Sequence, residues 1–231
     1  MNIISNYFRD WSWKERAWLA FVLLFQTGAW FVQDETTFML IMTLTSSLNL
    51  VLGAKGKIEG LYFAIINSAM YAWQCYGIPL YGEVMYHVLY SIPISAAAIY
   101  LWRHHLASTG EVEFRKMTLK EMVITTIATI AGIFIYAEVL KYMGGSFAFM
   151  DSLTTVVAVI ASYLYMKRYA EQWFMWIVVN VLEVAMWIMV YISGDEPSGL
   201  IILMHFINLL NCIYGFWNWR QISDRVSLQH A

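Results

Sequence analysis

Charged side chains are scarce in this sequence. Only 13% of the 231 residues are Asp, Glu, Lys or Arg, while 60% are hydrophobic and 17% are aromatic. A soluble globular domain carries about 25% charged residues, so this chain has too little polar surface to cover itself in water. The composition therefore indicates an integral membrane protein.

Proline and cysteine are also rare, with three and two residues, and the thirteen glycines follow no period. These counts exclude a disordered, collagen-like or disulfide-rich chain. Cys75 and Cys212 lie inside apolar runs, where we expect them to serve packing. The sequence has no HExxH, GxSxG or phosphate-binding glycine loop and no charged tail typical of nucleic-acid binding. We therefore expect no enzyme activity, metal, cofactor or nucleic-acid partner.

Long apolar runs make up most of the remaining sequence. A helix needs about 20 residues to cross a hydrocarbon layer of roughly 30 Å. The sequence predicts an all-α polytopic membrane protein with eight transmembrane helices, at 13–32, 36–52, 58–76, 82–102, 118–141, 146–166, 172–192 and 198–219. Pro93 is expected to kink the fourth of these helices, and Asp151 is expected to cap the sixth.

Basic residues indicate the orientation in the membrane. With a cytoplasmic N-terminus, 13 of the 14 Lys and Arg residues fall in cytoplasmic segments, and only Lys141 falls outside. Because cytoplasmic loops carry the excess of positive charge, we expect both termini in the cytoplasm. The first helix is expected to be retained, because a charged stretch precedes it and no cleavage pattern follows it.

A weak internal repeat relates the two halves of the chain. An offset of 113 residues aligns Asn67 with Asn180, and a slightly longer offset places His87 near His205. The repeat predicts two three-helix units in the same orientation, a pattern found in transporters with a substrate site between the halves. The predicted divisions are 1–35 with an extra helix, 36–103 and 146–220 as the repeats, 104–145 as loop and linker helix, and 221–231 as a cytoplasmic tail.

One face of the helix predicted at 172–192 is polar and aromatic. At about 100° per residue, five side chains fall on this face: Trp173, Trp176, Asn180, Glu183 and Trp187. An amide and a carboxylate at membrane depth need partners, so Asn180 and Glu183 should face the protein interior or a wet cavity. The indoles are suited to stack on a flat ring and to attract a cation. The face thus predicts a site for a flat, polar, cationic ligand.

Other polar residues at membrane depth extend the candidate site. We expect contributions from Asn67 and Gln74 on the third helix and from His87 on the fourth. Asn211 and Tyr214 stand one turn apart on the last helix, where they are suited to complete a ribose or amide site. For His205 alone the favoured interpretation is a hydrogen-bonded interior residue, and Glu138 is expected to pair with Lys141.

The spacing of Trp173, Trp176 and Asn180 resembles the WxxWxxxN signature of the PnuC family of bacterial vitamin transporters, whose members carry nicotinamide riboside. The resemblance extends over most of the chain. Its other elements are Gly53-Ala-Lys55-Gly-Lys57, Asn67, Tyr81-Gly82-Glu83, Asp151-Ser152, Arg168-Tyr169, Glu171-Gln172-Trp173 and Tyr214-Gly215-Phe-Trp-Asn-Trp219.

The resemblance implies a three-plus-one-plus-three core similar to that of SWEET proteins, an extra N-terminal helix and a homotrimer. It also implies a location in the bacterial inner membrane and facilitated diffusion without ion coupling, with a cytoplasmic kinase that traps the vitamin. By position, Trp173, Trp176 and Asn180 would hold the nicotinamide end, with Asn67 as the repeat counterpart. The chain differs from many relatives at three positions where they carry amide side chains: His87, Ser95 and Ser162. Glu183 is also not part of the signature.

Three alternatives stay open at this point. A relative that carries thiamin or riboflavin would have the same fold. A vitamin-binding subunit of an energy-coupled transporter would have about six spans and would need partner ATPases. A membrane enzyme or a purely structural bundle would show no saturable binding of any vitamin.

Overall fold

The computed structural model of the chain consists, over the residues that it describes, of helices and loops. It describes residues 8, 11–78, 80–106, 112–145, 147–194 and 199–229, with side chains up to Arg220. The helices are α2 (Trp13–Val32), α3 (Thr37–Ala54), α4 (Glu59–Tyr76), α5 (Tyr81–Met85), the π-helix η1 (Tyr86–Ser91), α6 (Ile92–Arg103), α7 (Leu119–Tyr142), α8 (Ala148–Met166), α9 (Gln172–Ser193) and α10 (Gly199–Gln229). Each predicted helix is present, with ends within two residues of the prediction except at the C-terminal end of α10.

Six of these helical segments are both long and apolar enough to cross a membrane within the described part of the chain: α3, the continuous α5–η1–α6 segment, α7, α8, α9 and α10 up to Arg220. The helices α2 and α4 have 20 and 18 residues but are less apolar. Charged residues open α2, whereas α4 contains tyrosines, an asparagine and a glutamine. The chain is therefore a multi-pass membrane protein by length and composition.

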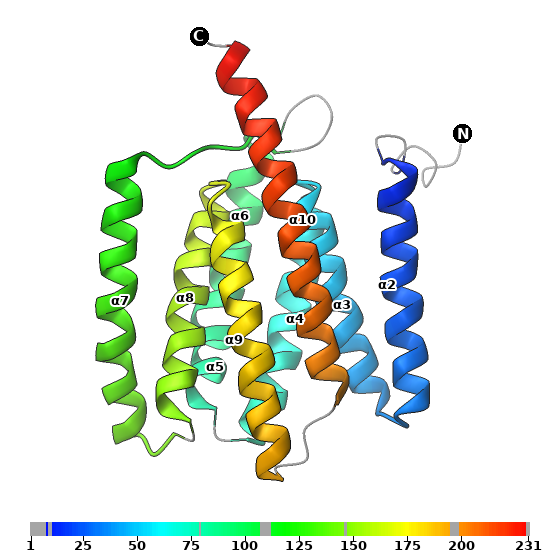
Figure 1. The fold of residues 1–231 in the computed structure, drawn as a ribbon, viewed down its shortest axis with the longest axis vertical. Helices are drawn as coiled ribbons and strands as arrows, with labels where there is room; N and C mark the ends of the chain where they lie inside the picture. Colours follow the sequence, from blue (N-terminus) through cyan, green and yellow to red (C-terminus); the bar gives the residue numbers. More distant parts are fainter. Residues whose placement is uncertain are drawn as a thin grey trace.

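Six helices form a closed ring at the centre of the molecule. Contacts run from α3 to α4, α4 to α6, α6 to α8, α8 to α9, α9 to α10 and back from α10 to α3. The helices α2 and α7 lie outside this ring at opposite flanks, where α2 packs on α3 and α7 packs on α8 (Figure 1). The ring contacts thus form pairs between the two halves of the chain, as do the contacts of α2 with α3 and of α7 with α8.

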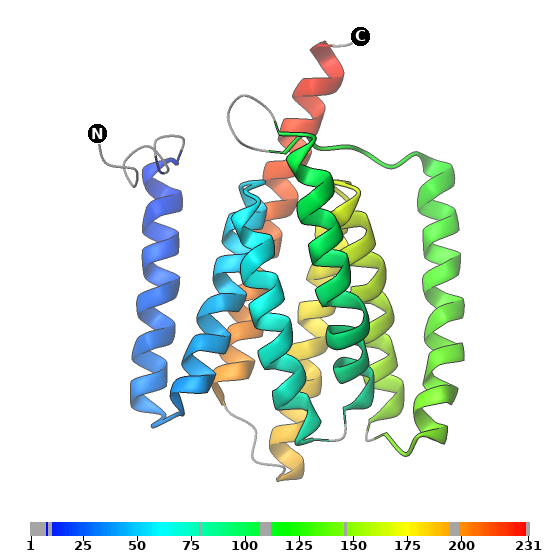
Figure 2. The same ribbon diagram turned by 180° about the vertical axis from the view of Figure 1, so that it is seen from behind.

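The two ends of the bundle differ in charge. One end of the bundle holds the start of α2, the end of α10 and the connecting residues 55–58, 104–106, 112–118 and 167–171 (Figure 2). The described lysines and arginines belong to this end, with the exception of Lys141 at the end of α7. Lys141 pairs with Glu138 at 2.6 Å, as expected from their spacing. We call the end with the other cations the basic end.

Local sequence explains how several helices begin and bend. Capping boxes start α2 at Ser12 and α7 at Thr118, where each hydroxyl accepts a backbone N–H and a glutamate three residues on completes the box. Pro93 lies at the start of α6, directly after the wide turn of η1. Since proline has no N–H, the normal helical hydrogen bond is absent there, and the π-helix absorbs the irregularity.

The prediction that Asp151 caps its own helix is wrong. Asp151 lies inside α8, and its carboxylate accepts a hydrogen bond of 2.8 Å from the backbone N–H of Gly82 at the start of α5. A side chain at position 82 would collide with this carboxylate. Asp151 therefore caps a helix of the opposite half of the chain and fixes α5 against α8.

The segment before α7 joins the two halves at the basic end. The Val112 N–H donates to Gly56 between α3 and α4, and the Arg115 N–H donates to Arg168 between α8 and α9. Between these contacts, the Phe114 ring stacks on Trp219 with centroids 4.0 Å apart. This segment closes the bundle next to its basic end.

Phe114→Ala is therefore expected to lower the free energy of unfolding by about 3 kcal/mol, because a buried ring leaves a cavity when it is removed. Thermal unfolding in detergent would measure the change. Phe31→Ala is the matched control, since Phe31 is 79% exposed and Phe114 is 7% exposed. Equal shifts for the two variants would contradict the packing role of Phe114.

Candidate functional site

The ring of helices encloses a cavity of about 110 Å³, whereas one water needs roughly 10–15 Å³. All six ring helices contribute to its wall. The polar and aromatic lining residues are Ser46, Asn49, Asn67, Ser68, Tyr71, Glu83, Tyr86, His87, Ser91, Ser95, Ser162, Tyr165, Trp173, Trp176, Asn180, Glu183, His205 and Asn208. A cavity of this kind between helices of a bundle is a typical ligand site.

The polar face of α9 points into this cavity. Trp173, Trp176, Asn180 and Glu183 all line it, in order from the basic end toward the opposite end. Trp187 continues the same face but does not line the cavity, because it lies about one turn beyond Glu183 along the helix. Its indole N–H instead donates to the Tyr71 hydroxyl at 2.6 Å.

Asn180 sits in the middle of α9 with its amide held on both sides. Its Nδ2 donates to the Trp176 carbonyl at 2.9 Å and contacts the Cys212 sulfur at 3.5 Å. Its Oδ1 lies 3.2 Å from Nδ1 of His205 on α10. The side chain is 4% exposed, so these contacts fix the amide at the cavity wall.

Glu183 belongs to a hydrogen-bonded group from three helices. The Tyr71 hydroxyl of α4 donates to Oε2 of Glu183 at 3.1 Å, and the same hydroxyl lies 3.1 Å from Nε2 of His205. His205 and Glu183 are 3.8 Å apart. Glu183 is 3% exposed, so its carboxyl group depends on these contacts in place of water.

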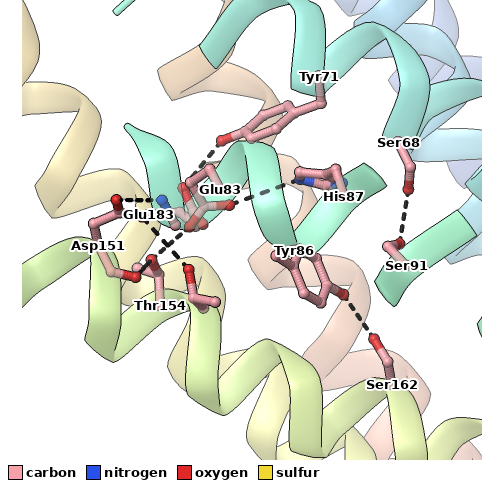
Figure 3. Close-up of polar contacts among 12 residues, drawn as sticks. Ser68, Tyr71, Glu83, Tyr86, His87, Ser91, Asp151, Thr154, Ser162 and Glu183 are labelled. Atoms are coloured by element: carbon pink, nitrogen blue, oxygen red, sulfur yellow. Dashed lines mark hydrogen bonds and ion pairs between the residues drawn. The ribbon is translucent and has the colours of Figure 1, made fainter. Parts of the chain in front are cut away.

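A second carboxylate from the first half meets Glu183 (Figure 3). Glu83 lies within hydrogen-bonding reach of Glu183 and accepts a 2.6 Å hydrogen bond from Thr154. His87, one turn after Glu83, approaches it to 3.7 Å. With Asp151 close behind, three carboxylates gather at the end of the cavity far from the basic end. We call Glu83, Asp151 and Glu183 the acidic group.

The middle of the cavity is lined by amides and hydroxyls. Asn67 donates to the Met42 carbonyl at 2.7 Å, and Asn208 donates to the Ser46 hydroxyl at 2.8 Å. Oδ1 of Asn208 and Nδ1 of His87 are buried without a hydrogen-bond partner among the described residues. Such atoms call for a water or a ligand. Asn67 and Asn180, the pair aligned by the repeat, face the cavity from α4 and α9.

Aromatic residues close the basic end of the cavity. The Trp173 ring is 1% exposed and lies edge-on to Trp219 and Tyr165, at centroid distances of 5.6 and 6.3 Å. Gly215 of α10 lies directly beneath this ring, and an added Cβ there would approach it to 2.7 Å. At the other end a core cluster that includes Leu80, Met186 and Trp187 lies beyond the acidic group.

The structure divides the nine predicted site residues into two sets. Six line the cavity: Asn67, His87, Trp173, Trp176, Asn180 and Glu183. Gln74, Asn211 and Tyr214 do not. Asn211 accepts a hydrogen bond from Trp18 of α2, and the Tyr214 hydroxyl donates to Glu15 at 2.5 Å, so both side chains dock α2 on the ring.

Sequence reasoning missed Tyr71 and Glu83 and gave His205 and Asn208 no site role. For Glu83 a signal was available, because it precedes His87 by four residues in an apolar run. Tyr71 looks like any of the other aromatic residues of α4. Its importance depends on contacts with α9 and α10.

Comparisons with known proteins agree with this architecture. A family model described as nicotinamide mononucleotide transporter matches residues 36–221. A protein of Neisseria mucosa named nicotinamide riboside transporter PnuC is 31% identical over 227 residues, which cover 96% of this chain and 86% of that protein. A Haemophilus influenzae protein of the same name is 29% identical over 226 residues, which cover 96% of each chain.

A solved structure shares the fold. The crystal structure of the vitamin B3 transporter PnuC superposes with a TM-score of 0.88 at 30% sequence identity. The match covers 96% of this chain and 97% of the other. The arrangement of helices around the cavity is therefore that of a known transporter structure.

Proposed function

The chain belongs to the PnuC family of transporters, and on that premise we propose that it takes up nicotinamide riboside across the bacterial inner membrane. Transport runs downhill by facilitated diffusion, and a cytoplasmic kinase maintains the gradient because it phosphorylates the vitamin. The described part of the chain consists of a helical bundle and its connections, which suits a carrier whose substrate gradient is maintained by another protein.

The observation that carries this proposal is the polarity of the cavity. Indoles and the Asn180 amide line it toward the basic end, carboxylates line it at the other end, and no lysine or arginine is among its described lining residues. Nicotinamide riboside combines a flat pyridinium ring, a carboxamide and a ribose. Indole faces attract such a cation, and amides pair with its carboxamide.

The proposed site consists of the six predicted residues that line the cavity. Trp173, Trp176 and Asn180 hold the nicotinamide end, with Asn67 opposite. Glu183 and His87 interact with the positive charge and the hydroxyl groups of the ligand. Gln74, Asn211 and Tyr214 lie outside the cavity lining and are not included.

The transport architecture is proposed from the paired contacts of the ring. The first unit is α3, α4 and α5–α6, the second is α8, α9 and α10, and α7 is the linker, which corresponds to a SWEET-like three-plus-one-plus-three arrangement with α2 added. Rocking of one unit against the other would open the cavity to alternate sides. We also propose that the basic end is cytoplasmic, as the positive-inside rule requires, and that the protein assembles as a homotrimer.

Nicotinamide mononucleotide is a second candidate, because the matching family model is described by that substrate. Its phosphate adds negative charge. Phosphate sites use Arg, Lys or backbone N–H groups at helix N-termini, whereas Glu83 and Glu183 line this cavity. The charge of the cavity therefore favours the riboside.

Calorimetric titration of the purified protein tests the proposal. The ligands are nicotinamide riboside, its mononucleotide, thiamin and riboflavin. We expect saturable binding of nicotinamide riboside alone, and uptake of it by liposomes that contain only this protein. Binding of thiamin or riboflavin instead would keep the family and change the proposed substrate to that vitamin. Binding without uptake by the protein alone would favour a subunit of an energy-coupled transporter. If none of the four ligands bound, the proposal of vitamin transport would be rejected.

Glu183→Gln tests the attraction between the acidic group and the charged ring. The reduced, dihydropyridine form of nicotinamide riboside is uncharged but keeps the carboxamide and ribose, so it isolates the effect of charge. We expect the wild type to prefer the cation and the variant to lose about tenfold of that preference, or roughly 1.4 kcal/mol. An unchanged ratio of the two dissociation constants would show that Glu183 does not sense the charge.

A further inference from the structure

His205 lines the cavity and holds the amide of Asn180. We propose that His205 is a positioning residue that fixes which way the Asn180 amide faces, and thereby the preference of the site for a carboxamide. The inference rests on the proposed function, in which Asn180 reads the nicotinamide end of the ligand. It concerns a histidine for which sequence reasoning favoured an ordinary interior role.

The hydrogen bonds of Asn180 permit one orientation. The Trp176 carbonyl can only accept, so the NH₂ group of Asn180, 2.9 Å away, must face it. Oδ1 of Asn180 then faces Nδ1 of His205 at 3.2 Å, and Nδ1 must carry the proton for this contact to be a hydrogen bond. The remaining neighbour, Cys212, is a weak donor and a weak acceptor and cannot choose between the two orientations.

His205 is itself held in place. Its ring is 7% exposed, and its Nε2 lies 3.1 Å from the Tyr71 hydroxyl. That hydroxyl also contacts Glu183 at 3.1 Å and accepts from Trp187 at 2.6 Å. With the proton on Nδ1, Nε2 can only accept, so His205 and Glu183 share the single hydroxyl proton of Tyr71. The imidazole is therefore held between Asn180 on one side and Tyr71 on the other.

A fixed amide discriminates between ligands. The carboxamide of nicotinamide has a donor and an acceptor side by side, and an oriented asparagine amide presents one arrangement of donor and acceptor to it. If the amide turns over, donors face donors and the hydrogen bonds are lost. The N–H of His205 is the one donor to Oδ1 among the described contacts of Asn180. Without it, the amide is held only on its NH₂ side, by the Trp176 carbonyl and the weak contact with Cys212, and can swing away from the ligand.

Three variants separate positioning from other roles. In His205→Asn the side-chain amide nitrogen takes the place of Nδ1, so it keeps the donor to Asn180. His205→Gln places its amide near Nε2, which keeps the contact with Tyr71 but not the donor to Asn180. His205→Leu keeps neither contact. The probes are nicotinamide riboside and the riboside of unsubstituted pyridine, which has the same charge and ribose but no carboxamide.

We expect the Leu and Gln variants to bind nicotinamide riboside at least about tenfold more weakly than wild type, while their affinity for the pyridine riboside is unchanged. The Asn variant should keep the wild-type preference. Calorimetry on the full-length protein in detergent measures all eight affinities. A variant that does not fold is recognised by the loss of pyridine riboside binding, and the remaining variants still decide the question.

Two results would overturn the inference. Equal weakening for both ligands in all three variants would mean that the imidazole is needed for structure or touches the ligand itself. Retention of the carboxamide preference in the Leu variant would mean that Asn180 is oriented by other contacts. A wild-type protein that binds neither riboside would instead refute the proposed function.

Discussion

Asn180→Leu is expected to abolish saturable binding of nicotinamide riboside while the protein still folds and reaches the membrane. Leucine has nearly the same shape but removes the amide that faces the cavity. It also leaves the N–H of His205 without its partner. Loss of two hydrogen bonds to the ligand corresponds to roughly 100-fold or more in affinity. Calorimetry and uptake into liposomes measure the effect.

Asn211→Leu is the matched control for this variant. Asn211 is buried on α10 like Asn180 on α9, with exposures of 2% and 4%, but it faces Trp18 of α2 and not the cavity. We expect this variant to lose some stability and to keep its affinity for the vitamin. Wild-type uptake by Asn180→Leu would remove Asn180 from the site.

Gly215→Ala is expected to damage both stability and binding. The added methyl group would lie 2.7 Å from the Trp173 ring, which is buried and packed edge-on against Trp219 and Tyr165. Overpacking of this kind costs about 1–3 kcal/mol. Because Trp173 lines the cavity, its displacement also changes the proposed binding site. Thermal unfolding and vitamin titration measure the two effects separately.

Gly28→Ala provides the same substitution at a site without contacts. A Cβ at Gly28 meets nothing within 4 Å, and the residue lies inside α2, four residues before its last residue. Since alanine is a better helix former than glycine, stability should be unchanged or slightly higher. If Gly215→Ala behaved like Gly28→Ala, the Trp173 ring would have room to move, and the close packing at the basic end would be disproved.

The positions of the helices follow directly from the sequence. Each apolar run is about as long as a membrane is thick, and charged residues, glycine or proline interrupt the chain between runs. Short-range features could also be predicted from the sequence, such as the pairing of Glu138 with Lys141 three residues away. The cap at Asp151 was predicted wrongly because a carboxylate near a helix start normally caps its own helix. Here α8 begins at Ala148, three residues before Asp151, and the carboxylate caps α5.

The face of α9 could be predicted because its residues share one helix. The period of 3.6 residues per turn sets the angles between Trp173, Trp176, Asn180 and Glu183, whatever the helix packs against. Trp187 shares the angle but lies about 10 Å further along the axis than Asn180, at 1.5 Å per residue, and this places it beyond the cavity. The period predicts direction, whereas the extent of the cavity depends on the neighbouring helices.

The sequence thus determines the number and length of the helices, the separation of charge between the two ends and the polar face of α9, because these depend on neighbours within a few turns. The partners of that face come from elsewhere in the chain. Tyr71 and His205 lie 112 and 22 residues from Glu183, and Glu83 lies 100 residues away. Their meeting depends on how α4, α5 and α10 pack around α9, and a shift of one residue along any of these helices would turn the side chain by about 100°. Only the tertiary structure determines which of these side chains meet the polar face of α9.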